Sequence, residues 1–157
     1  MSFDITNNLN DKILDNVNRC SYDMYVLHKY TNMICTCVNN ETDQADIYCK
    51  KCLGTKYKIS IRKIKAASQD SNIPTTLRTE SFYIARNIYM KSNIECLKDD
   101  IIIDNDDIYF ILDIQNLFSL KGSVPYKRAI AVKKKFDTKI FIKNFKEIIK
   151  KSRWVYW

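Results

Sequence analysis

Residues 98–118 read KDDIIIDNDDIYFILDIQNLF, and this stretch decides the fold that we predict from the sequence. Two isoleucine-rich runs flank the tripeptide Asp104-Asn105-Asp106, and β-branched and aromatic residues favour strands. Asn and Asp tolerate the left-handed backbone conformation that tight turns require. The stretch therefore predicts a β-hairpin with strands over residues 99–104 and 107–120.

The same strand character continues on both sides of the hairpin. Residues 81–90, SFYIARNIYM, and residues 125–135, PYKRAIAVKKK, also predict strands. Residues 58–62, KISIR, alternate polar and apolar side chains, as is typical of a half-buried strand, and residues 25–31, YVLHKYT, indicate an extended segment. The pattern predicts a β-rich core over residues 80–135.

Two amphipathic helices are predicted outside the strands. Apolar residues with the spacing of one helical face indicate the N-terminal helix: Leu9, Ile13, Val17, Cys20 and Met24. Residues 137–157 are predicted to form a C-terminal helix and an aromatic tail, and the helix has lysines on one side and apolar residues on the other: Phe141, Phe145, Ile148 and Ile149. The predicted fold class is α+β, an antiparallel β-sheet or small barrel-like sandwich with an N-terminal and a C-terminal helix.

The 157 residues have the length of a single domain, 1–157. Residues 68–80, SQDSNIPTTLRTE, contain turn-forming residues and one of only two prolines, so they predict a long loop or arm. Residues 154–157, WVYW, form an aromatic tail after the C-terminal helix. Because Trp and Tyr contribute strongly to interfaces, this tail is interpreted either as a lid on the core or as an anchor in a neighbouring protein.

Four of the six cysteines lie in a four-cysteine insertion over residues 33–57. They form a C-x-C pair and a C-x2-C pair separated by eleven residues, and the four positions are Cys35, Cys37, Cys49 and Cys52. Two short pairs on a loop of this length can hold one ion tetrahedrally, with metal–sulfur bonds of about 2.3 Å. The spacing predicts a structural zinc site with these four ligands. Four reduced thiols or a disulfide are the alternatives.

The other two cysteines and the only histidine are given structural interpretations. Cys20 and Cys96 lie on apolar patterns and are interpreted as core residues. His28 precedes Cys35 by seven residues in a strand-like run, and we interpret it as a surface or packed histidine rather than a fifth ligand. Four thiolates complete a tetrahedral site, so a zinc ion bound here is expected to be structural.

No motif indicates catalysis. The hairpin aspartates Asp104, Asp106 and Asp107 could hold Mg²⁺ or Ca²⁺, but the glycine and distal glutamate of a calcium loop are missing, which favours a role in the turn. The sequence has no P-loop, no G-x-G-x-x-G, no H-E-x-x-H and no G-x-S-x-G, and a single histidine leaves little for acid–base chemistry. The sequence therefore predicts no enzymatic activity and no catalytic residue.

Charge is distributed unevenly along this chain of net charge +8. Residues 95–113 contain seven acids and one base, whereas residues 127–153 contain eleven bases and two acids. Such a split favours binding to nucleic acid or end-to-end contact between copies of one chain, and a solvated face is the alternative. The N-terminus lacks a signal-peptide pattern and no apolar run is long enough to span a bilayer, so we expect no membrane partner. In a reducing compartment, free thiols or a metal site are expected rather than disulfides.

Two stretches resemble proteins of tailed bacteriophages. Residues 35–59, CTCVNNETDQADIYCKKCLGTKYKI, resemble a segment of small phage structural proteins. Residues 97–118 and 125–137, which contain the hairpin and PYKRAIAVKKKFD, resemble strand pairs of head-closure and neck proteins. Residues 49–56, CKKCLGTK, also resemble the C-x-x-C-x-G-x-G motif that DnaJ-type chaperones contain in four copies. This chain has a single copy, and Lys56 replaces the final glycine of the motif, which argues against a chaperone.

The resemblance implies a ring-forming head–tail connector protein of the phage neck. Among the crAss-like phages, the protein that it implies is the ring protein. It implies a homo-oligomeric ring, expected to be a dodecamer that contacts the portal protein and other neck or tail proteins. The implied location is the virion, at the portal vertex, after synthesis in the bacterial cytoplasm. Inward-facing lysines would contact packaged DNA without reading its sequence. The alternative is a zinc-ribbon nucleic-acid-binding accessory protein that uses residues 56–65 and the C-terminal helix.

Overall fold

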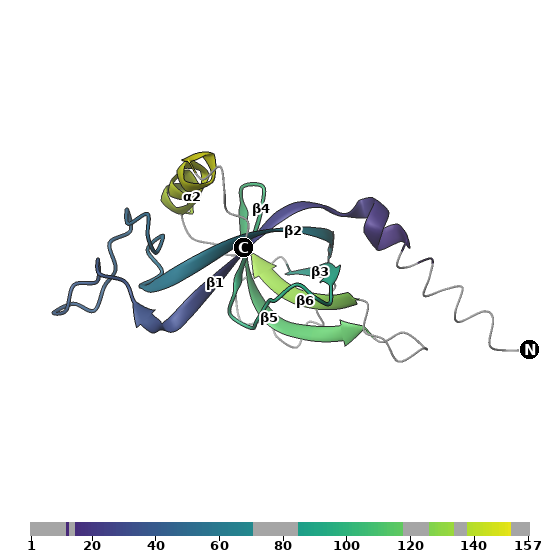
Figure 1. The fold of residues 1–157 in the computed structure, drawn as a ribbon, viewed down its shortest axis with the longest axis horizontal. Helices are drawn as coiled ribbons and strands as arrows, with labels where there is room; N and C mark the ends of the chain where they lie inside the picture. The colour runs from purple at the N-terminus through teal and green to yellow at the C-terminus, as the bar shows by residue number, and fades with distance from the viewer. Residues whose placement is uncertain (1–11, 13–14, 71–84, 118–125, 134–137, 152–157) are drawn as a thin grey trace, which may run out of the picture.

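The computed structural model describes residue 12 and residues 15–70, 85–117, 126–133 and 138–151. Within these ranges six antiparallel strands form a closed barrel in the order β1-β2-β3-β6-β5-β4 (Figure 1). The strands are β1 (Tyr22–Ile34), β2 (Tyr57–Asp70), β3 (Ala85–Lys91), β4 (Ile101–Asp104), β5 (Asp107–Leu117) and β6 (Tyr126–Lys133). Two short helical segments accompany them, residues 15–20 and α2 (Lys139–Lys151). The fold is therefore mainly antiparallel β, and of the two predicted sheet arrangements the structure adopts a barrel.

The predicted hairpin is formed by β4 and β5. β4 ends at Asp104 and β5 begins at Asp107, so Asn105 and Asp106 form the turn. Asn105 has a φ of 55°, in the left-handed region that asparagine tolerates. β3 and β6 occur in the segments predicted as strands on either side. The described parts of these strand predictions are confirmed, while residues 81–84, 118–120, 125 and 134–135 lie outside the described residues.

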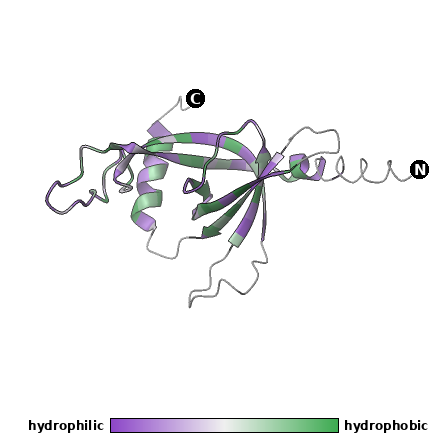
Figure 2. Ribbon diagram, turned by 90° about the horizontal axis from the view of Figure 1, so that it is seen from below, coloured by the Kyte–Doolittle hydropathy of each residue, from purple (hydrophilic) through white to green (hydrophobic). Residues whose placement is uncertain are grey.

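Strand alternation fills the barrel with apolar side chains. The buried residues of this interior core are Met24, Val26, Ile64, Ala66, Ile88, Met90, Cys96, Ile102, Tyr109, Ile111, Ala129 and Ala131. Figure 2 shows the strands coloured largely as hydrophobic where they form the barrel. Cys96 is 5% exposed, which confirms its interpretation as a core residue. A barrel of few strands is expected to be filled by side chains in this way.

A second core, the outer core, lies between the barrel wall and α2. Its buried residues are Leu27, Leu53, Ile61, Ile101, Ile103, Ile108, Ile142 and Phe145. The ring of Tyr25 packs edge-on against Phe145, with ring centroids 5.2 Å apart. All four residues of β4 are buried, because Ile102 faces the interior core while Ile101 and Ile103 face the outer core. The apolar face predicted for the C-terminal helix packs on this outer core.

The N-terminal segment differs from its prediction. Residues 15–20 are helical, whereas Leu9 and Ile13 lie outside the described residues. Met24 belongs to β1 and is fully buried through strand alternation rather than through helical spacing. The interpretation of Cys20 as a core residue is wrong, since its side chain is exposed at the end of the helical segment.

β2 is longer than the predicted strand at residues 58–62. Residues 68–70, which we assigned to the loop or arm of residues 68–80, continue β2 and pair with β3, with Ser68 opposite Ile88. Pairing with β3 gives these backbone groups hydrogen-bond partners that the local sequence does not reveal. Residues 71–80 of the predicted loop and the aromatic tail at residues 154–157 lie outside the described residues.

β1 and β2 extend beyond the barrel as a two-stranded ribbon (Figure 1). β1 pairs with β4 only over residues 25–27, and β2 pairs with β3 only over residues 66–70. The two strands nevertheless pair with each other as far as Ile34 and Tyr57. The cysteine loop, residues 35–56, follows the end of the ribbon, and its residue Leu53 packs back against barrel residues of the outer core. Neither helical segment in the described part of the chain combines the length and apolarity needed to cross a bilayer.

Candidate metal centre

The cysteine loop folds so that its two cysteine pairs meet. Sγ of Cys35 lies 3.8 Å from Sγ of Cys49, and Sγ of Cys37 lies 3.5 Å from Sγ of Cys52. All four sulfurs lie within 4.8 Å of one another. Four thiolates around a tetrahedral ion, each about 2.3 Å from it, are separated by about 3.8 Å. The structure therefore brings together all four predicted ligands at a spacing that fits one metal ion.

A tight turn after the second cysteine pair gives the loop its shape. The backbone N–H of Leu53 donates to the carbonyl oxygen of Cys49 at 2.8 Å. Leu53 and Gly54 have φ values of 52° and 72°, and only glycine adopts this region without strain. A Cβ atom on Gly54 would also lie 3.3 Å from the Cα of Ile47. These two constraints explain why one of the two glycines of the chain occurs here.

Burial and hydrogen bonding give three of the thiols different pKa values. Burial favours a higher pKa at Cys49, but backbone hydrogen bonds from Lys51 and Cys52 and the neighbouring thiols lower its pKa to about 7. Burial and the Cys37 thiol raise the pKa of Cys52 to about 12, and burial also raises the pKa of Cys37. A bound cation would favour the thiolate form of all four. Near neutral pH, Cys49 is therefore more readily deprotonated than Cys37 or Cys52.

Metal affinity is expected to fall as the pH is lowered. The pKa values of Cys37 and Cys52 are raised, so their protons leave only when the metal binds, and Cys49 becomes protonated below about pH 7. For each proton that the metal displaces on binding, the affinity falls about tenfold per pH unit. Below about pH 7 the proton on Cys49 must also be displaced, so the affinity should fall more steeply there. Competition with a chelator of known protonation behaviour between pH 8 and pH 5 would measure it. An affinity independent of pH would contradict thiolate ligation.

The cysteine loop is attached to α2 by packing and by polar contacts. Leu53 is 3% exposed and belongs to the outer core together with residues of α2. Lys50 Nζ lies 2.5 Å from Glu147 Oε2, and this hydrogen bond lowers the pKa of Glu147. Asn144 Nδ2 donates to the carbonyl oxygen of Ile47 at 3.5 Å. The loop that holds the four cysteines therefore packs together with the C-terminal helix in one outer core.

The hairpin aspartates do not converge on a common point. Each has a different cationic partner: Asp104 lies 3.0 Å from Arg86, Asp107 lies 2.7 Å from Lys133, and Asp106 lies 2.5 Å from Lys146. Of the described residues, only the four cysteines form a group that could hold a metal ion. The aspartates instead serve the turn and ion pairs, and their charges are compensated within the chain.

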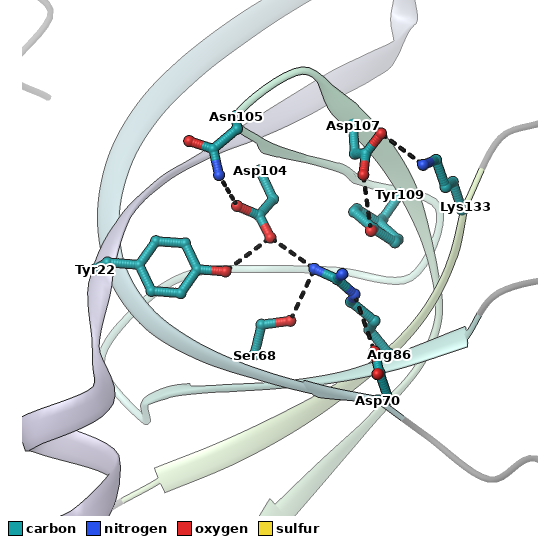
Figure 3. Close-up of polar contacts among 9 residues, drawn as sticks. All are labelled: Tyr22, Ser68, Asp70, Arg86, Asp104, Asn105, Asp107, Tyr109 and Lys133. Carbon is teal, nitrogen blue, oxygen red and sulfur yellow. Dashed lines mark hydrogen bonds and ion pairs between the residues drawn. The ribbon is translucent and has the colours of Figure 1, made fainter.

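Asp104 lies in a buried polar cluster at one end of the barrel (Figure 3). Its side chain is 4% exposed and accepts hydrogen bonds from the Tyr22 hydroxyl at 2.8 Å and from Asn105 Nδ2 at 3.0 Å. Burial and the bond to Asp104 raise the pKa of Tyr22. The guanidinium of Arg86 lies 5.3 Å from the ring centroid of Tyr109. The cluster closes this end of the interior core. Within it, Asp104 pairs with Arg86 and Asp107 pairs with Lys133.

His28 contacts a buried carboxylate at the other end of the barrel. Its Nδ1 lies 2.7 Å from Oδ1 of Asp100, a residue that is 3% exposed. Oδ2 of Asp100 accepts a hydrogen bond from the Leu97 backbone at 2.8 Å. The His28 ring also packs edge-on against Tyr30. His28 is thus a packed histidine separate from the four thiols, and sequence reasoning missed Asp100 as its partner.

Neither a protein-family model nor a curated protein matches this sequence. Functional inference therefore depends on the four-thiol centre, the projecting ribbon and the positions of charged side chains.

Proposed function

We propose that this chain is a zinc-binding structural protein without enzymatic activity that forms a ring in the neck of a tailed bacteriophage. The observation that carries this proposal is the four-thiol centre at the end of the ribbon. Four cysteine ligands fill a tetrahedral site and leave no open position for a substrate, which is the arrangement of structural rather than catalytic sites.

Zinc is the metal that we assign to this centre. Tetrahedral sites with four sulfur ligands hold zinc or iron, and zinc adds no redox chemistry to a structural role. The cysteine loop contains one isolated β-bridge, Asn39 with Gln44, and a few backbone turns. Such a segment cannot supply much of its own folding free energy, so a metal ion is the natural source of its order.

The ribbon supports assembly with other chains. Within the described residues, the outer edges of β1 after Leu27 and of β2 before Ala66 have no strand partner. The end of the ribbon also exposes large apolar side chains: Met33, Ile34, Ile47 and Tyr48 are 46%, 57%, 55% and 63% exposed. Unpaired strand edges and exposed large apolar side chains are features of surfaces that bind another chain. We place the ring contact here, since the hairpin acids already have partners within the chain.

The proposal includes the partners that the phage resemblance implies. Head-to-tail contacts close into a ring when their rotation allows it, and a dodecamer would match the portal. The neighbours would be the portal protein and other neck or tail proteins, with the subunit located in the virion at the portal vertex. Exposed lysines of α2 would supply non-specific contacts with packaged DNA: Lys139, Lys143, Lys146, Lys150 and Lys151.

Native mass spectrometry of the full chain is expected to show one zinc ion per subunit and a large oligomer that persists at high salt, alone or with its portal. Ile34→Lys should disrupt the oligomer, because it places a charge in the proposed contact. Leu112→Lys is the matched control, since Leu112 is 42% exposed on β5, away from the ribbon. A monomer at every concentration, with and without the portal, would rule out the ring. The zinc-binding part of the proposal would be unaffected by that result.

A nucleic-acid-binding accessory protein is the second candidate. The lysines of α2 favour it, because they occupy the exposed side of the helix while Ile142 and Phe145 are buried. Such a protein would remain small, and its affinity for DNA would fall steeply with the logarithm of salt concentration. Weak binding to DNA at physiological salt, together with a large oligomer, would favour the neck protein.

A further inference from the structure

The barrel has a second polar end, opposite the cluster around Asp104. In the strand register Val26 of β1 lies opposite Arg62 of β2, and Met90 of β3 lies opposite Lys127 of β6. Residues opposite each other in an antiparallel pair face the same side of the sheet. Because Val26 and Met90 are interior residues, Arg62 and Lys127 are directed toward the barrel axis as well.

A cavity of about 470 Å³ opens at this end of the barrel. Its polar lining includes His28, Arg62 and Lys127, and its apolar lining includes Val26 and Leu97. The buried thiol of Cys96 also lines it, and burial raises the pKa of that thiol to about 12, so it is a neutral part of the wall. Cavities of this size hold small molecules, and the mouth of a β-barrel is a common place for them.

Two cationic side chains line this cavity, and one of them, Arg62, has a buried donor without an acceptor. Lys127 is 9% exposed, and no carboxylate of the described residues lies within ion-pair distance of its ammonium group. Nε of Arg62 is buried without a hydrogen-bond partner, while its Nη1 lies 2.8 Å from Glu95. A buried donor without an acceptor is costly and uncommon in folded proteins. A ligand that supplies an acceptor would remove this cost.

The two acids of the cavity already have partners. Asp100 interacts with His28 and with the Leu97 backbone, and Glu95 pairs with Arg62. Neither compensates the charge of Lys127 at ion-pair distance. An incoming anion would therefore meet a positive charge that is free to bind it.

We propose that this cavity binds a small organic anion. Its carboxylate or phosphate group would contact Lys127 and Arg62, and its apolar body would lie against Val26 and Leu97. Neither the zinc centre nor ring formation requires this ligand, so the inference is independent of the proposed function.

The ring of His28 gives a direct measurement, because it is the only histidine of the chain. Benzoate and adenosine 5′-monophosphate, added to the metal-loaded full chain, are expected to shift its ring signals in NMR spectra, and at least one of them should do so saturably. Benzamide has the same body as benzoate without the charge and should produce no saturable shift. Comparing the two anions distinguishes a carboxylate ligand from a phosphate ligand.

Lys127→Met is expected to weaken the saturable response at least about tenfold and to leave the melting temperature unchanged or higher, because it removes an unpaired buried charge and retains the aliphatic chain. Lys127→Arg should retain binding, which separates loss of charge from loss of fold. Lys98→Met is the matched control, since Lys98 is exposed in the segment beside the cavity but does not line it. An equal response to benzamide, or full binding by Lys127→Met, would overturn the proposal, as would no saturable response to either anion.

Discussion

Replacing Cys49 and Cys52 with serine is expected to abolish metal binding and to loosen both the cysteine loop and α2. Structural zinc contributes about 10–16 kcal/mol of apparent binding free energy in small zinc-binding peptides. Leu53 follows Cys52 directly and is buried in the outer core with α2, so disorder at the metal centre should propagate to the helix. Amide exchange in both segments should accelerate at least about a hundredfold, equivalent to about 3 kcal/mol of local stability.

Elemental analysis and hydrogen exchange followed by mass spectrometry would measure these effects. Cys20→Ser is the control, because Cys20 is exposed and lies outside the centre. Removing the metal from the unmodified chain with a chelator should reproduce the variant, and adding zinc should reverse it. Faster exchange in the loop with unchanged exchange in α2 would contradict the packing link through Leu53. Unfolding of the whole barrel would show that the centre is not a separable unit.

Packing rather than charge carries this link between the metal centre and α2. Lys50 and Glu147 are 52% and 36% exposed, and pairs on a surface of this kind contribute little to stability. Leu53 loses nearly all of its exposure, and apolar burial is the larger favourable term. The turn after the second cysteine pair thus has two effects, since it brings these thiols to the other pair and places Leu53 in the outer core.

Local sequence was sufficient to predict the hairpin, the convergence of the four cysteines and the apolar face of α2. Asn105 is the turn residue, and the four cysteines converge because their pairs are short and their loop is long enough to fold back. The sequence could not decide between an open sheet and a barrel, because closure depends on β1 pairing with β4, between residues about 75 positions apart. The burial of β4 on both faces follows from the same closure.

The buried polar contacts escaped prediction for the same reason. His28 meets Asp100 across 72 residues, and Tyr22 meets Asp104 across 82 residues. Only strand register shows that these side chains share a barrel end. The uneven charge along the sequence suggested attraction between copies, yet Asp107 pairs with Lys133 of the same chain. Charge counts along a sequence do not reveal which charges are already compensated.

Replacing Arg86 with methionine is expected to lower the free energy of unfolding by about 3–5 kcal/mol, because it leaves the buried carboxylate of Asp104 without its cation. Tyr22 and Asn105 would still donate hydrogen bonds to Asp104, but neither carries a charge. Urea unfolding of the metal-loaded protein would measure the change. Methionine retains an aliphatic chain of similar length, so the change in packed volume is small.

Two further variants identify the source of the loss. Lys133→Met breaks the more exposed pair with Asp107, whose side chains are 36% and 39% exposed, and it should cost at most about 1 kcal/mol. Adding Asp104→Asn to Arg86→Met should restore part of the stability, since an amide can accept the Tyr22 hydrogen bond without carrying a buried charge. If the double variant were as unstable as Arg86→Met alone, the loss would come from the other contacts of the guanidinium, with the Tyr109 ring, Asp70 and Ser68. The ionic account of this barrel end would then be wrong.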